Sequence, residues 1–235
     1  MAYNYLDLTN EVLARFNEVA LTSSNFINSR GFQTQCKNAV NDAINYVNTR
    51  EYGWPYNHAT QTETLVAGTT RYSIPATAKH VDYDTFRIIR DDSLGSQGRS
   101  LTILDYKDYL NRFIEQEDRA NVGGIPTHVF RTPDNKFGFF PYPDKAYSVK
   151  FEYYVYTTAL SAATDIPTIP EQYRQVIVDG ATAFGYQYRG EGGEYQLNFA
   201  RFEDGIKSMQ SLLSNRMDYI RSTVILKSTI GSNIL

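Results

Sequence analysis

The sequence predicts an α+β fold: a helical bundle from the N- and C-terminal segments, with a central antiparallel β module that is sandwich- or barrel-like. The main observation is a change of period. Apolar residues recur every three to four positions before Trp54-Pro55 and again after Pro170, and alternate with polar residues in between. The predicted domains are 1–52 with 168–221 (helical), 53–167 (β, with one short helix) and 222–235 (an apolar docking arm).

Bulk composition limits the classes of function. The 235 residues carry a net charge of -3, with 23 basic residues scattered among 26 acidic ones, so no basic footprint for gripping nucleic acid is expected. Cys36 is the single cysteine, which excludes an intrachain disulfide and a Cys-rich zinc site. The first residues are not expected to form a signal peptide, and no apolar run approaches the roughly 18 residues of a membrane span. We therefore expect folding in a cytoplasm and no membrane partner.

Two helices are predicted in the first fifty residues. The first follows from apolar residues at helical spacing: Leu8, Val12, Leu13, Phe16 and Val19. Asp7 or Thr9 is expected to cap its start. The second carries an apolar stripe of Phe32, Cys36, Val40, Ile44 and Val47. On this stripe Cys36 is expected to be a core residue and not a nucleophile.

The central region is predicted to be strands and turns. Thr62–Val66 and Arg71–Ile74 are expected to form a hairpin around Ala67-Gly68-Thr69. Further strands are predicted at Val81–Ile89, Leu101–Leu104, Thr127–Arg131, Phe137–Phe140 and Tyr147–Tyr156, with a short helix around Tyr106–Phe113. In the last strand apolar residues alternate with Ser148, Lys150 and Glu152, so one face is expected to be buried.

Two antiparallel helices are predicted after Pro170, joined by the short link Gly190–Gly193. The second has apolar residues at mostly alternating three- and four-residue steps, like a coiled-coil seam: Tyr195, Phe199, Phe202, Ile206, Met209, Leu213, Met217 and Ile220. If continuous, this helix would be roughly 40 Å long.

The last segment, 222–235, fits neither element. Its apolar residues are Val224, Ile225, Leu226, Ile230, Ile234 and Leu235, and they have nothing downstream to pack on. Such a segment can add a strand to its own sheet or dock on a neighbouring chain.

Tyrosine and phenylalanine are abundant, with 19 and 13 copies against one Trp. Tyrosine is enriched at protein interfaces. Aromatic residues also favour strands. Composition alone leaves both explanations open.

The sequence offers little catalytic chemistry. His58, His80 and His128 are far apart and lack metal-ligand spacing, and no nucleophile elbow occurs. We expect no catalytic residue, no cofactor and no metal. Two alternatives remain: a glycan hydrolase that uses Asp82, Asp84 or Glu115, and a carbohydrate-binding tail protein that uses the tyrosine-rich strand.

The order of several motifs resembles the tail tubular protein A family, the head-to-tail adaptors of short-tailed bacteriophages. The motifs are Gly124-Ile125-Pro126, Pro133-Asp134, Pro141-Tyr142-Pro143-Asp144, the Tyr147–Tyr156 strand and Ile169-Pro170-Glu171-Gln172-Tyr173. The resemblance covers residues 3–220 or so, and it is least clear between Leu65 and Ser100. The segment after Arg221 has no counterpart in it.

The resemblance implies a structural virion protein of the neck, assembled in the host cytoplasm. It implies a homo-oligomeric ring of twelve copies under the portal, which carries the tail nozzle and lets double-stranded DNA pass without specific binding. No catalytic residue comes with the family. The apolarity of 222–235 predicts that this arm docks on the portal. The β module is expected to face the nozzle through Phe130, Phe137, Phe139, Tyr142, Tyr154 and Tyr156.

Overall fold

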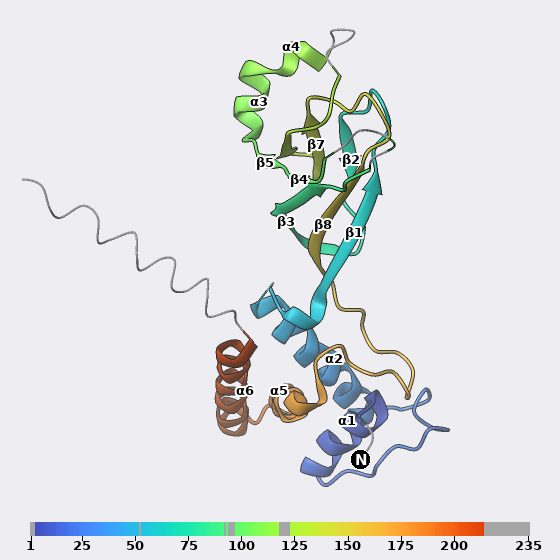
Figure 1. Ribbon diagram of the computed structural model, residues 1–235. Helices are drawn as coiled ribbons and strands as arrows, with labels where there is room; N and C mark the ends of the chain where they lie inside the picture. Colours follow the sequence, from blue (N-terminus) through green and yellow to red (C-terminus); the bar gives the residue numbers. More distant parts are fainter. Residues whose placement is uncertain (1–2, 52, 92, 94–96, 118–122, 214–235) are drawn as a thin grey trace, which may run out of the picture. The chain divides into compact units, whose positions relative to one another are not determined.

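The computed structural model describes residues 3–51, 53–91, 93, 97–117 and 123–213. The chain divides into two compact units, Met1–Tyr56 with Thr157–Leu235 and Asn57–Tyr156. The first unit is helical and the second is built from two β-sheets with short helices (Figure 1). The predicted α+β class is confirmed.

Among the described residues, four α-helices form the first unit. They are α1 (Tyr5–Arg15), α2 (Phe32–Arg50), α5 (Arg174–Arg189) and α6 (Gly192–Leu213), and the 3-10 turn η2 (Glu171–Tyr173) leads into α5. Their buried faces share one core, in which Cys36 is fully enclosed on α2 as predicted.

The start and the end of α1 differ from the prediction. Asn4 is the cap, because its side chain accepts a hydrogen bond of 2.8 Å from the main-chain N–H of Asp7. Asp7 and Thr9 instead lie inside the helix. The helix ends at Arg15, and Asn17 has a left-handed backbone with φ of 56°. Val19 is consequently outside the helix and 77% exposed.

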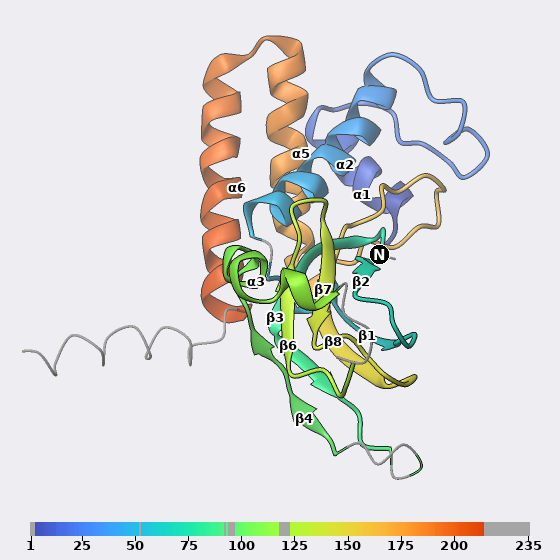
Figure 2. The same ribbon diagram turned by 90° about the horizontal axis from the view of Figure 1, so that it is seen from above.

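The predicted antiparallel pair of helices is confirmed. Gly190 ends α5 in the left-handed conformation, with φ of 77°, which a glycine adopts without a steric penalty. The chain then turns back into α6, which runs beside α5 (Figure 2). Phe202, Ile206 and Met209 of the predicted seam are buried. Its last two members, Met217 and Ile220, lie outside the described residues.

The β unit contains two sheets. One has the order β1 (His58–Thr64), β8 (Ser148–Val155), β3 (Ala78–Ile88) and β4 (Arg99–Ser100). The other has the order β2 (Arg71–Ser73), β7 (Lys136–Phe140), β6 (His128–Arg131) and β5 (Thr102–Ile103). All pairs are antiparallel except β5 with β6, which is parallel. The module is therefore mixed in strand direction, whereas the prediction was purely antiparallel.

The predicted hairpin around Gly68 is wrong. Its two strands lie in different sheets: β1 pairs with β8, and β2 pairs with β7. Gly68 adopts φ of 78° and its N–H donates to the carbonyl of Pro143 at 2.8 Å, which ties the turn to another loop. The turn therefore carries the chain from one sheet to the other.

The two sheets share one aromatic core. Phe86 and Phe151 stack with ring centroids 4.6 Å apart, and Phe137 meets both rings edge-on. These contacts come from both sheets, as expected for a sandwich. The short helices α3 (Tyr106–Arg112) and α4 (Ile114–Glu117) follow β5. Tyr109 of α3 stacks on Phe130 of β6, with ring centroids 3.9 Å apart.

Candidate interaction surfaces

Three of the aromatic residues expected to face the nozzle are core residues. Phe130, Phe137 and Phe139 have no exposed surface. Phe130 lies between Tyr109 and Gly138, so closely that a Cβ at position 138 would stand 2.3 Å from its Cζ atom. A side chain enclosed in this way cannot contact a partner, and the predicted surface role of these three residues does not fit the structure.

The tyrosines of the same prediction are more accessible. Tyr142 and Tyr154 are half-buried, and Tyr156 is 61% exposed. Tyr154 contacts the ring of His58 across β1 and β8, with ring centroids 5.7 Å apart. Tyr156, just after β8, is thus the most available of the six residues. The tyrosine excess is divided between core and surface.

The predicted docking arm lies outside the described residues. This concerns Val224, Ile225, Leu226, Ile230, Ile234 and Leu235. Their role stays a prediction.

The histidines lie in three different settings. His58 contacts Glu152 at 3.1 Å on the solvent face of the sheet, and His128 contacts the hydroxyl of Thr127 at 2.6 Å. His80 lies on β3. Among residues 3–213, apart from the short gaps, no three metal-ligating side chains come together.

The carboxylates of the hydrolase alternative do not form a catalytic pair. Asp82 accepts a hydrogen bond of 3.2 Å from the main-chain N–H of Asp84, a local contact along β3. Asp84 lines an open groove of about 400 Å³ with Glu152 and two arginines, and neither Asp82 nor Glu115 lines it. A glycosidase needs two carboxyl groups that flank one substrate bond. The geometry gives this alternative no specific support.

A second groove, of about 470 Å³, runs beside the first half of β3. Its lining includes Lys79, His80, Tyr83 and Arg131. The hydroxyl of Tyr83 is buried without a hydrogen-bond partner among the described residues, and burial raises its pKa. The basic lining suits an anionic group, but Lys79 and His80 already interact with other residues.

The free edge of β1 is the part of the β unit that is best suited to pair with a further strand. Among the residues that the structure describes, β1 is the outermost strand of its sheet and pairs with β8 alone, without interruption from His58 to Thr64 (Figure 1). Its side chains are exposed or half-buried at every position. A paired strand of this length offers a row of unused main-chain groups on its other side. The sequence predicts a hairpin strand at Thr62–Val66, which overlaps only the last three residues of β1.

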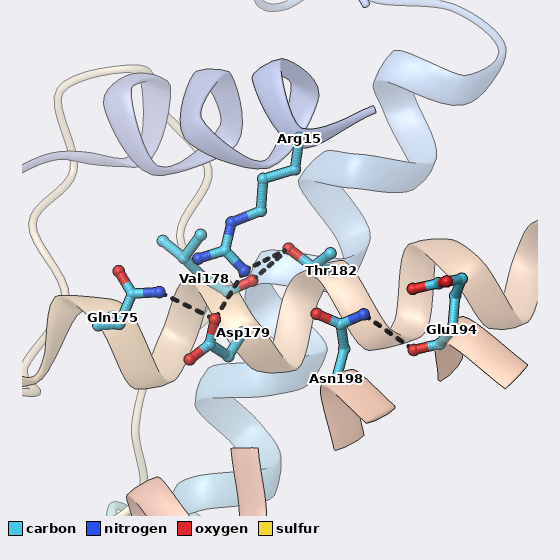
Figure 3. Close-up of polar contacts among 7 residues, drawn as sticks. All are labelled: Arg15, Gln175, Val178, Asp179, Thr182, Glu194 and Asn198. Carbon is cyan, nitrogen blue, oxygen red and sulfur yellow. Dashed lines mark hydrogen bonds and ion pairs between the residues drawn. The ribbon is translucent and has the colours of Figure 1, made fainter. Parts of the chain in front are cut away.

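A polar network fixes α1 to α5 in the helical unit (Figure 3). Arg15 donates to Asp179 at 2.6 Å and to the hydroxyl of Thr182 at 3.2 Å, and the Thr182 hydroxyl donates to the carbonyl of Val178. The side-chain amide of Gln175 donates to the same oxygen of Asp179 at 2.9 Å. Each of the four side chains in this network has a partner within it, so its role is structural.

The described part of the chain combines an open strand edge, accessible tyrosines and a well-buried helical core. In addition, no helix of residues 3–213 that the structure describes could cross a membrane. The family model of the SU10 adaptor protein matches residues 3–225, so the chain belongs to this family. No curated protein matches the chain. The chain is thus a phage adaptor, a structural component of the virion neck, and the resemblance seen in the sequence is confirmed.

Proposed function

We propose that the protein is a head-to-tail adaptor whose copies form a ring between the portal and the tail nozzle and extend the DNA channel. The observation that carries this proposal is the family match over residues 3–225, which includes both the helical and the β unit. The ring of twelve copies rests on the resemblance to the tail tubular protein A family.

Charge supports a passive role toward DNA. With 26 acidic and 23 basic residues, the chain lacks the excess of cations that phosphate neutralisation requires. Double-stranded DNA could therefore pass such a ring without being held by it. The nozzle side of the proposal rests on the β unit, in which Tyr156 is the most exposed of the predicted contact residues.

The test is to mix the purified chain with the portal of the same phage and measure the mass by light scattering after size-exclusion chromatography. The expected result is a stable complex with one adaptor ring per portal. Addition of the nozzle protein should increase the mass further. A chain that binds neither portal nor nozzle, and phage particles that gain tails without it, would contradict the proposal.

Retention on double-stranded DNA is a second measurement. We expect no binding at roughly physiological salt, because few phosphates would be neutralised. Tight, salt-sensitive binding would contradict the passive channel.

A further inference from the structure

The two sheets of the β unit have four edges, and one of them differs from the rest. The edge strands β2, β4 and β5 are three, two and two residues long, whereas β1 has seven. Short edge strands are one way in which proteins prevent unwanted strand pairing. β1 lacks this protection, and its length is sufficient to pair with an added strand.

The register shows which main-chain groups are free. The N–H of Leu65 donates to the carbonyl of Tyr147 at 2.8 Å, and the pairing continues without a shift to His58. In an antiparallel ladder every second residue faces the partner strand. The residues that face β8 are therefore Ala59, Gln61 and Glu63. The main-chain groups of His58, Thr60, Thr62 and Thr64 point away from β8, toward the open edge.

The usual edge blockers are also absent from β1. The strand HATQTET has no proline and no lysine, and the β1–β8 register contains no bulge. Its three threonines favour extended backbone. Glu63 is the exception, because a charged side chain can also hinder strand pairing. It lies with Gln61 on the half-buried side of the strand, and it disfavours an added strand that has an acidic residue opposite it.

Segment 222–235 of the same sequence has the chemistry of a matching strand. It contains five β-branched residues and no proline in its first nine positions, namely Thr223, Val224, Ile225, Thr229 and Ile230. Lys227 is its single charged residue, opposite in sign to Glu63. A lysine across from a glutamate stabilises a strand pair.

We infer that the free edge of β1 receives residues 222–235 of a second copy of the chain as an added strand. The inference deepens the proposed adaptor ring by naming a contact between its copies. The donor segment and the acceptor edge are different surfaces, so the contact is heterologous, which is the type that closes into rings. The sequence alone predicts the portal as partner of 222–235, and the open edge makes a neighbouring copy the better match.

The first experiment compares the mass of the full chain with that of a chain lacking residues 222–235. Both unit cores lie within residues 3–213, so the truncated chain should fold. The full chain should form oligomers at micromolar concentration, and the truncated chain should be monomeric. An unchanged oligomer would overturn the inference, and so would a full chain that stays monomeric.

The second experiment adds a synthetic peptide of residues 222–235 to the truncated chain. Hydrogen exchange of the Thr60 and Thr62 amides should slow on binding, because they gain carbonyl partners. Thr60→Pro and Thr62→Pro remove these donors, and proline is tolerated at an open edge. Both variants should lose peptide binding at least tenfold, while the matched variants Thr60→Ala and Thr62→Ala retain it. Unchanged exchange on peptide addition would overturn the inference.

A charge reversal tests the register without altering the main chain. Glu63→Lys should weaken binding of the peptide about two- to fivefold, and a peptide with Lys227→Glu should restore it. Equal affinities in all four combinations would contradict the pairing of Glu63 with Lys227. Portal binding by a chain that fails these tests would overturn the inference and leave the adaptor proposal standing.

Discussion

Gly180 on α5 lies directly against the ring of Phe202 on α6, so that a Cβ at position 180 would stand 2.7 Å from Cε2 of Phe202. Phe202 is fully buried and packs on Tyr46 and Phe184 as well. The ring therefore has little room to move away. The absence of a side chain at position 180 sets the distance between the two helices.

We expect Gly180→Ala to destabilise the helical unit by up to about 2 kcal/mol. Alanine is the better helix former by about 1 kcal/mol, but overpacking of a core costs about 1–3 kcal/mol and should prevail here. The measurement is urea unfolding followed by circular dichroism at 222 nm. Gly192→Ala is the control, because a Cβ there meets nothing within 4 Å, and it should not lower the midpoint.

Asn41 ties the loop after the β unit to the helices. Its Nδ2 donates to the hydroxyl of Tyr5 and to the carbonyl of Leu160, both at 3.0 Å, and its Oδ1 accepts from the N–H of Leu160 at 2.9 Å. Asn41→Ala leaves these half-buried groups without partners, which should cost about 1–3 kcal/mol. Unfolding in urea gives the loss of stability, and faster hydrogen exchange at Leu160 shows where it arises. A loss below about 0.5 kcal/mol would contradict this role.

Cys36 should be inert in the folded protein. Its side chain has no exposed surface, and burial raises the pKa of its thiol to about 12, so very little thiolate is present near neutral pH. We expect reaction with a thiol reagent such as DTNB at pH 8 to be at least a hundredfold slower in native buffer than in urea. Rapid labelling of the native protein would show that α2 opens locally.

The fold class and most helices followed from the sequence, because hydrophobic periodicity is a local signal. The stripe that contains Cys36 and Val40 predicted α2 correctly, and alternation around Val149 predicted β8. The partner of a strand is not a local property. Local patterns therefore predict one hairpin from Thr62–Val66 and Arg71–Ile74, although β1 pairs with β8 and β2 pairs with β7 in separate sheets.

The candidate contact residues were harder to predict for the same reason. Aromatic residues suit both a sheet core and an interface. The sequence could not show that Phe137 and Phe139 are enclosed whereas Tyr156 is open. The open edge of β1 depends on which strand lies outermost, and only the sheet order reveals it.

Alkaline pH should destabilise the helical unit through Tyr5. Burial, with the nearby carboxylates of Asp42 and Asp165, raises the pKa of its phenol from 10.0 to about 12. The folded state thus holds this proton more tightly than the unfolded chain does. The stabilising contribution is complete below pH 10 and is lost as the pH rises from 10 to about 12.

Tyr5→Phe should remove this contribution to the alkaline loss of stability. At neutral pH the variant should be about 1 kcal/mol less stable, because the hydrogen bond from the hydroxyl to the carbonyl of Lys37 is gone. Between pH 10 and 12 the difference from the parent protein should shrink. Urea titrations at several pH values measure both effects. Tyr188→Phe, at a site that is 60% exposed, is the control and should follow the parent at every pH. A constant difference between Tyr5→Phe and the parent would show that this phenol does not couple ionisation to folding.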